Sequence, residues 1–316
     1  MVLDRTAQKW LQNHFKDDVR FDEPMSGHTS LKVGGPAEAL VTPATLQDLR
    51  LLIQWTGEAE LPFIVIGDGT NLLVKDSGIA GIVIVLTKCL NQISTIERRS
   101  GGVMVRAMAG ARLHKLCAFA MAANLKGMNF ALGIPGTVGG AIMMNAGTSH
   151  GWIEDVLQGI NILTPAGETQ TVTKERLDFS YRKLSLKNEI ANLTPGYPII
   201  IDGHFYLYPS DGHQLQQEAE EILKKRKVNQ PAHLPSAGCF FKNPASGKPA
   251  GELIDLAGLK GKKIGGALIS PKHANFIINS GGASAGDILA LMETAQTAVM
   301  KMFNIELEPE VKIVGR

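Results

Sequence analysis

The spacing of apolar and polar residues along the chain predicts a series of short helices and strands. Residues 1–20 have the pattern of a short amphipathic helix. Thr45 begins a clearer helix, because Asp48 completes a capping box with it and an apolar stripe follows. The stripe consists of Leu46, Leu49, Leu52 and Ile53. Short apolar runs at 63–66 and 82–86 predict strands around a glycine-containing loop. The pattern therefore predicts a small unit of helices and strands.

The middle of the chain has a different pattern. A strand beginning at Val103 precedes a helix with one apolar side. This side is formed by Leu113, Leu116, Phe119 and Ala120. Residues 133–151 are rich in glycine, and residues 160–173 predict a β-hairpin around Pro-Ala-Gly-Glu. Another apolar run at 199–201 predicts a strand, so a second α+β unit is expected here.

A third unit follows the break at 210–212. Residues 213–227 predict a long charged helix with acidic residues first and basic residues last, as the helix dipole favours. Ser284 and Asp287 form another capping box ahead of an apolar stripe. Three strands are expected at 265–270, 274–279 and 311–315. We expect an α+β fold of three α/β-type units, with boundaries at 1–83, 84–208 and 209–316.

Composition narrows the class of protein. The 316 residues are 44% hydrophobic and carry a net charge of +2, which argues against nucleic-acid or membrane-surface binding but permits one anionic ligand. Cys89, Cys117 and Cys239 are too scattered for a disulfide framework or a zinc site, and the histidines lack metal-ligand spacing. The start lacks the apolar core of a signal peptide, and no apolar run is long enough to span a membrane. We expect a reduced, cytoplasmic protein without a catalytic metal, and a monomer as the simplest assembly.

Glycine loops are the first sign of chemistry. Glycines cluster at 34–35, 67–69 and 133–140, the last with four glycines in eight residues. Glycine lets backbone approach a ligand closely, and consecutive free N–H groups form an anion-binding hollow. Two such loops are suited to gripping one pyrophosphate, although tight turns explain single loops equally well. The dinucleotide fingerprint G-x-G-x-x-G is absent, which disfavours a Rossmann NAD domain.

Several longer blocks resemble the MurB reductase family. They are HTSLKVGGPAE (28–38), IGDGTNLLVKDSGIAGIVI (66–84), GIPGTVGGAIMMNAG (133–147), FSYRKLS (179–185), KRKVNQPAHLPSAGCFFKNP (225–244), AGELIDLAGLKGKKIGGALISPKHANFIINSGGASAGDIL (250–289) and LEPEVKIVG (307–315). The resemblance runs from about residue 20 to the end of the chain. The GDGTN block is also similar to the wider vanillyl-alcohol-oxidase-like (PCMH-type) FAD proteins.

This resemblance implies a fold, a cofactor and a reaction. It implies FAD between the first two units and a UDP-sugar mainly over the third. The short connection between Arg182 and Tyr206 resembles the family's shorter subtype, which lacks an inserted tyrosine loop. The implied reaction belongs to peptidoglycan synthesis. Hydride passes from NADPH through flavin N5 to C3 of UDP-N-acetylglucosamine enolpyruvate, and a proton added at C2 gives UDP-N-acetylmuramate.

The family's motifs place three catalytic residues in this chain. Arg182, in Tyr-Arg, is expected to hold the substrate carboxylate, because a guanidinium stays charged and binds carboxylates bidentately. Glu310 is expected beside it, as a carboxyl whose raised pKa lets it donate a hydrogen bond. Cys239 stands where the family usually has serine as the acid for C2, and a thiol serves only while protonated. Ser236 is a second-ranked donor. Without the motif, a structural ion pair is the better explanation of Arg182 and a solvated surface charge that of Glu310. A small buried apolar side chain is then the better explanation of Cys239.

The remaining site residues also follow from the resemblance. Substrate contacts are expected from Tyr181, Lys227, Asn243 and, more weakly, Asn275, whereas His273 is expected to be structural. FAD contacts, mostly through backbone, are expected from Gly67, Asp68, Gly69, Thr70, Asn71, Leu72, Gly133, Pro135, Gly136, Thr137, Gly139, Gly140, Asn145 and Gly147.

Three alternatives stay open at this point. Another FAD enzyme of the same superfamily, such as a sugar or alcohol oxidase, shares the GDGTN loop but not the PSAGCFFKNP block. A nucleotide-sugar binding protein without redox activity is a different class, and a colourless protein that binds UDP-sugars would favour it. A Rossmann NAD oxidoreductase is the third.

Overall fold

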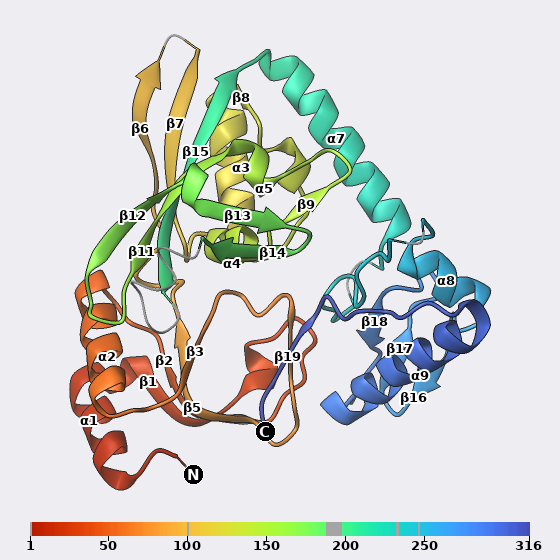
Figure 1. Ribbon diagram of the computed structural model, residues 1–316, viewed down its shortest axis with the longest axis horizontal. Helices are drawn as coiled ribbons and strands as arrows, with labels where there is room; N and C mark the ends of the chain where they lie inside the picture. Colours follow the sequence, from red (N-terminus) through yellow and green to blue (C-terminus); the bar gives the residue numbers. More distant parts are fainter. Residues whose placement is uncertain (1, 100, 188–197, 232–233, 246) are drawn as a thin grey trace.

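The computed structural model describes residues 2–99, 101–187, 198–231, 234–245 and 247–316. Helices and strands are mixed along the chain, and the three larger sheets lie in different parts of the molecule (Figure 1). The expected α+β class is confirmed. The short connection between Arg182 and Tyr206 includes residues that lie outside the described ranges, so the expected subtype stays a prediction.

The first sheet has the order β1-β2-β5-β3, and helices α1 and α2 lie beside it (Figure 1). The elements are α1 (Arg5–Phe15), β1 (Val19–Pro24), β2 (Pro36–Val41), α2 (Leu46–Glu58), β3 (Phe63–Ile66), β4 (Leu72–Val74) and β5 (Ile79–Val85). The capping box of Thr45 and Asp48 is confirmed. The expected helix over 1–20 is too long, because Lys16 takes a φ of 45° and ends it before β1.

The second sheet is antiparallel, with the order β12-β11-β15-β7-β6, and the short strand β8 pairs with β15. Its strands are β6 (Ile93–Arg99), β7 (Gly102–Met108), β8 (Leu125–Lys126), β11 (Leu157–Leu163), β12 (Thr169–Thr173) and β15 (Ile199–Pro209). The hairpin expected at 160–173 is confirmed as β11–β12. Helices α3 (Leu113–Ala122), α4 (Val138–Met143) and α5 (Ile153–Val156) lie against one face of the sheet (Figure 1).

Two small hairpins lie beside this sheet. They are β9 (Gly147–Thr148) with β10 (Gly151–Trp152), and β13 (Leu177–Ser180) with β14 (Lys183–Leu186). Apolar periodicity did not reveal either hairpin. The second one carries Tyr181 and Arg182 at its turn.

The third unit has a sheet of order β16-β17-β18 and two helices. Its elements are α8 (Ala250–Leu256), β16 (Lys263–Ile264), β17 (Ala267–Ile269), β18 (Ile277–Asn279) and α9 (Ala285–Phe303). The long helix α7 (Gly212–Asn229) leads to it from the second unit (Figure 1). The second expected capping box is confirmed at the start of α9.

The end of the chain returns to the first unit. Strand β19 (Lys312–Val314) pairs in parallel with β4, with Lys312 opposite Leu72. Figure 1 shows β19 beside the first unit, close to the C-terminus. This pairing places the 307–311 segment next to the GDGTN loop. It explains how a residue near the C-terminus comes close to the flavin loops.

The three expected boundaries stay a prediction. One apolar core contains α1 and α2 of the first unit together with α3, α4 and the second sheet, and β5 runs across the expected boundary at 83/84. A separate core holds α8 and α9. No helix in the described part of the chain is both long and apolar enough to cross a membrane.

Candidate active site

The two expected flavin loops lie in contact. A Cβ on Gly67 would stand 2.2 Å from Thr137 Oγ1, and one on Gly136 would stand 2.8 Å from Thr70 Oγ1. Gly69 has a φ of 60°, and a Cβ there would meet the carbonyl oxygen of His28 at 2.0 Å. Only glycine fits these three positions. The close approach of the two loops therefore depends on these glycines.

The 67–72 loop keeps backbone donors available for an anion. Among the described residues, the N–H groups of Asp68, Gly69 and Thr70 make no hydrogen bond, although Gly69 is a buried residue. Buried backbone donors normally have partners. Arg112 Nη2 lies 3.5 Å from Asp68 Oδ1 and offsets its negative charge. These features fit the diphosphate of FAD.

The second loop supplies fewer free donors than expected. The N–H of Gly139 donates to the carbonyl of Ala109 at 2.8 Å, so this donor is used within the protein, and the expected FAD contact of Gly139 stays a prediction. Gly139 instead packs tightly, since a Cβ there would lie 2.8 Å from that of Ala109. Thr137 is buried and begins α4, with its hydroxyl facing the N–H of Gly140 at 3.4 Å. Gly133 and Pro135 are exposed at its start.

Substitution of Gly67 tests the contact between the loops. We expect Gly67→Ala to lower the free energy of unfolding by about 1–3 kcal/mol, because the new methyl group overpacks against Thr137. Gly57→Ala is the control, since a Cβ there meets nothing within 4 Å and alanine is the better helix former. Urea denaturation and the flavin content of the purified proteins measure the difference. Equal stability of the two variants would contradict the packing argument.

Arg182 and Glu310 form an ion pair at the centre of the site. Arg182 Nε lies 2.8 Å from Glu310 Oε1, and both side chains are mostly buried. The N–H does not point along that line, so the contact is an ion pair and not a well-directed hydrogen bond. Nη1 of Arg182 also donates to the carbonyl of Gly147 at 3.2 Å. Arg182 has a φ of 60°, a strained conformation for a non-glycine residue that is common at functional sites.

Two residues expected to bind FAD, Asn145 and Asn71, make hydrogen bonds within the protein close to this ion pair. The amide of Asn145 contacts Glu154 Oε2 at 2.9 Å and, more weakly, the carbonyl of Ser180 at 3.4 Å. Asn71 Nδ2 donates to the carbonyl of Glu310 at 3.1 Å. These two amides therefore support the Arg182 turn and Glu310, and their expected FAD contacts stay predictions.

Cys239 lies beside Glu310. The backbone N–H of Glu310 donates to the carbonyl of Phe240 at 2.8 Å, which joins the segment just before β19 to the residue following Cys239. The hydroxyl of Ser236 accepts the N–H of Gly238 at 3.1 Å, a local turn that leaves Ser236 with a structural role. The structure thus brings Arg182, Cys239 and Glu310 together from three separate parts of the chain.

The environment favours protonated acids at this place. Burial, with a contribution from Glu310, raises the pKa of the Cys239 thiol to about 12, against the opposing charges of Arg182 and Arg226. Burial also raises the pKa of Glu310, although Arg182 partly offsets it. Burial therefore keeps the thiol of Cys239 in its proton-bearing form and makes Glu310 easier to protonate than an ordinary glutamate.

At the basic end of α7, Arg226 and not Lys227 lies closest to the glycine loops. Lys227 is exposed, and its backbone carbonyl accepts a hydrogen bond from Lys272 Nζ at 2.7 Å. Arg226, which the sequence left as an ordinary helix-end charge, is partly buried and donates to the carbonyl of Gly133 at 3.0 Å. Its charge also acts on Cys239. The structure therefore brings Arg226 to the site and leaves the substrate contact of Lys227 a prediction.

Two expected substrate residues already have partners in the protein. Asn275 is buried, and its amide both accepts from the N–H of Phe241 and donates to its carbonyl, at 2.9 and 2.8 Å. Asn275 thus holds the loop that carries Cys239, and its expected substrate contact stays a prediction. Asn243 Oδ1 accepts from the N–H of Ala250 at 3.1 Å, while its NH₂ group remains exposed.

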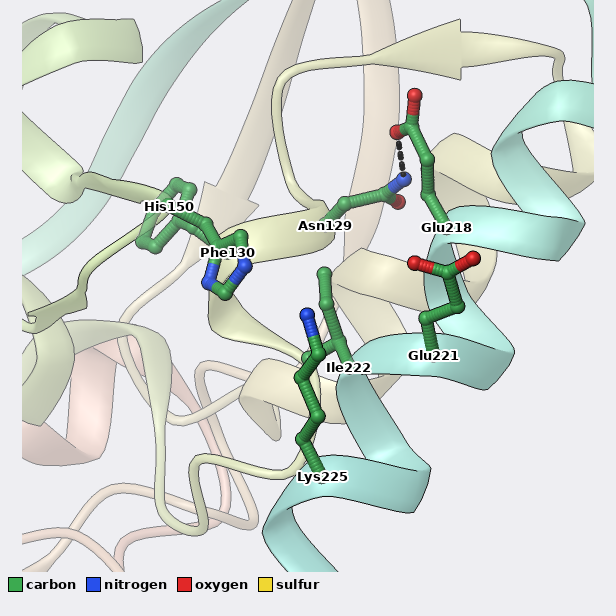
Figure 2. Close-up of a pocket in the computed structure, with 7 residues that line it drawn as sticks. All are labelled: Asn129, Phe130, His150, Glu218, Glu221, Ile222 and Lys225. Atoms are coloured by element: carbon green, nitrogen blue, oxygen red, sulfur yellow. Dashed lines mark hydrogen bonds between the residues drawn. The ribbon is translucent and has the colours of Figure 1, made fainter.

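A surface hollow lies away from this cluster, between α7 and the residues after α3 (Figure 2). Asn129 donates to Glu218 Oε2 across it at 3.0 Å, and Lys225 and His150 line its other side. Among the described residues, no group of acidic, cysteine and histidine side chains could hold a metal ion.

The paired glycine loops define a flavin-binding protein, and comparison with known proteins agrees. Residues 37–173 match the model of an FAD binding domain. Residues 230–314 match the model of the UDP-N-acetylenolpyruvoylglucosamine reductase C-terminal domain.

Relatives are similar over nearly the whole chain. A UDP-N-acetylenolpyruvoylglucosamine reductase of Desulfosudis oleivorans is 48% identical over 99% of this chain and 100% of its own. One from Clostridium botulinum is 42% identical over 95% and 93%. The crystal structure of UDP-N-acetylenolpyruvylglucosamine reductase (MurB) from Thermus caldophilus covers 92% of this chain and 97% of its own, with a TM-score of 0.74 and 34% identity. The chain belongs to the UDP-N-acetylenolpyruvoylglucosamine reductase family. The expected family and its FAD cofactor are confirmed.

Proposed function

We propose that this chain reduces UDP-N-acetylglucosamine enolpyruvate to UDP-N-acetylmuramate in peptidoglycan synthesis, with NADPH as hydride donor. The observation that carries the proposal is the meeting of Arg182, Glu310 and Cys239 beside the two glycine loops. A cation, a carboxyl and a thiol at one place suit a substrate that carries a carboxylate and must receive a proton.

FAD supplies hydride transfer when it is bound between the loops, and the protein supplies charge and a proton. Hydride arriving at C3 leaves negative charge spread over C2 and the carboxylate. Arg182 binds that carboxylate, and its permanent charge stabilises the developing anion. Its contacts with Glu310 and Gly147 fix the guanidinium before substrate arrives, so little reorganisation is needed.

Glu310 assists Arg182 at the carboxylate. Burial raises its pKa, so binding of a second carboxylate favours its protonated form. A protonated Glu310 donates a hydrogen bond to the anion instead of repelling it.

Cys239 donates the proton to C2. The S–H bond breaks, a C–H bond forms at C2, and the thiolate left behind is stabilised by the charges of Arg182 and Arg226 until water returns a proton. Tyr181, Lys227 and the exposed amide of Asn243 remain proposed contacts for the UDP-sugar.

The raised pKa of Cys239 gives a direct prediction. With a pKa of about 12, well above the reference value of about 8.5, the thiol stays protonated between about pH 6 and 9. Ultraviolet absorbance of the thiolate, measured as wild type minus Cys239→Ser, should show no step over that range. A step near the reference pKa would contradict the protonated thiol and weaken its assignment as an acid.

An anaerobic absorbance titration tests the function as a whole. The purified protein should be yellow, bleach with NADPH, and be reoxidised by one equivalent of the enolpyruvyl substrate without oxygen. Reoxidation only by oxygen would favour an oxidase of the same superfamily. A colourless protein that binds UDP-sugars would favour a binding protein without redox activity.

The setting of the enzyme is part of the proposal. We propose a cytoplasmic monomer that binds neither nucleic acid nor membranes. The net charge of +2 and the scattered cysteines support this setting. Size-exclusion chromatography with light scattering tests the monomer.

A further inference from the structure

Two aromatic rings form a corner around the Arg182 guanidinium. The rings of Trp152 and Tyr181 meet edge to face, with centroids 5.9 Å apart and planes at 74°. The guanidinium carbon lies 5.2 Å from both centroids. A cation within about 6 Å of an aromatic face is attracted by the ring's quadrupole. Arg182 is thus held by two rings in addition to its polar contacts.

The Trp152 ring is fixed by its own hairpin. Trp152 pairs with Gly147 across β9 and β10, and a Cβ on Gly147 would lie 2.3 Å from the indole ring. The backbone N–H of Trp152 donates to Asp155 Oδ2 at 2.7 Å. Because the ring lies directly against the Gly147 backbone, it forms a firm wall for the guanidinium.

The polar contacts of Arg182 leave one end open. Nε faces Glu310 and Nη1 donates to Gly147, but among the described residues Nη2 makes no hydrogen bond. The two rings contact the flat face of the guanidinium and use none of its N–H groups, which therefore stay available to a ligand. We propose that Trp152 is a positioning residue, which together with Tyr181 clamps Arg182 so that its free N–H groups meet the substrate carboxylate. This inference rests on the proposed function.

Binding measurements with two product-like ligands test the clamp. UDP-N-acetylmuramate carries the carboxylate that Arg182 is proposed to bind, whereas UDP-N-acetylglucosamine lacks it. In the FAD-loaded enzyme, we expect Trp152→Leu to weaken binding of the first ligand by about 5- to 30-fold, the range that cation–π contacts allow. Binding of the second should change less than about twofold, since the rest of the ligand is the same. Isothermal titration calorimetry measures both.

Two further variants separate positioning from folding. Trp152→Phe keeps an aromatic face and should restore binding of UDP-N-acetylmuramate to within about threefold. Trp152→Leu made in an Arg182→Ala background should cause no further loss, because the clamp then has nothing to hold.

Other results would overturn the inference. Equal weakening of both ligands, or the same loss with and without Arg182, would mean that Trp152 supports the fold or touches the ligand itself. Unchanged binding in Trp152→Leu would exclude the clamp. If the wild-type enzyme binds neither ligand, the proposed function fails first, which the wild-type titration shows separately.

Discussion

Replacement of Cys239 by alanine should abolish substrate reduction while leaving reduction of the flavin by NADPH intact. Removal of a positioned general acid typically costs about 10²- to 10⁴-fold, and we expect that loss in the rate of reoxidation by the enolpyruvyl substrate. Protonation at C2 needs a donor near the carboxylate, and Cys239 is held beside Glu310 by the hydrogen bond between Glu310 and Phe240. Anaerobic stopped-flow measurement of the two half-reactions separates the effects.

Two variants control for this result. Cys239→Ser replaces the thiol with a hydroxyl, the proton donor expected at this position in the family. We expect its rate of reoxidation by the enolpyruvyl substrate to lie within about tenfold of wild type. Cys89→Ala removes a partly buried thiol between β5 and β6 and should leave both half-reactions unchanged. Full activity of Cys239→Ala would disprove the proton-donor role and leave Glu310 as the nearest buried acid.

Elements with strong local signals were predictable from the sequence. The helices beginning after Thr45 and Ser284 were confirmed because each capping box fixes the start, and apolar stripes continue the helix. The β11–β12 hairpin was predicted from its turn residues. The strand β1 was missed, because the polar pattern of residues 19–24 reads as a continuation of α1 and the backbone break at Lys16 has no sequence signal.

The site was predictable only where a motif named a residue. The catalytic roles of Arg182, Cys239 and Glu310 were predicted from the family resemblance. Their contacts depend on the pairing of β4 with β19 and on the β13–β14 hairpin, which has no clear apolar periodicity. Sequence spacing alone cannot bring residues 182 and 310 together. Trp152 was missed for the same reason, since its role depends on a ring approaching across Gly147.

The sequence also did not reveal where the protein itself uses the polar group of an expected site residue. Asn275, Asn145 and Asn71 each read as ligand-binding amides, yet each holds a backbone segment next to the site. An amide that supports a catalytic loop and one that binds a ligand have the same sequence signal. On α7, one helical position separates Lys227 from Arg226, and a turn of about 100° per residue decides which side chain faces Gly133.

Substitution of Arg182 should have the second large effect. We expect Arg182→Lys to slow reoxidation by the enolpyruvyl substrate by about 10²- to 10³-fold, a typical cost of losing one donor to developing negative charge. Lysine keeps the charge but lacks the planar fork, so it cannot face Glu310 with one nitrogen, reach Gly147 with another and still meet a carboxylate.

The neighbouring lysine provides the matched control for this prediction. Lys183 lies on the same hairpin, is exposed, and should tolerate alanine with less than a twofold change in either half-reaction. Arg182→Lys should also weaken the contact that opposes the raised pKa of Glu310, so Glu310 should hold its proton to higher pH in this variant. Comparison of the pH profiles of substrate reoxidation checks both points. A rate for Arg182→Lys equal to that of Lys183→Ala would show that positive charge on the hairpin suffices, and that the geometry of the guanidinium does not govern the reaction.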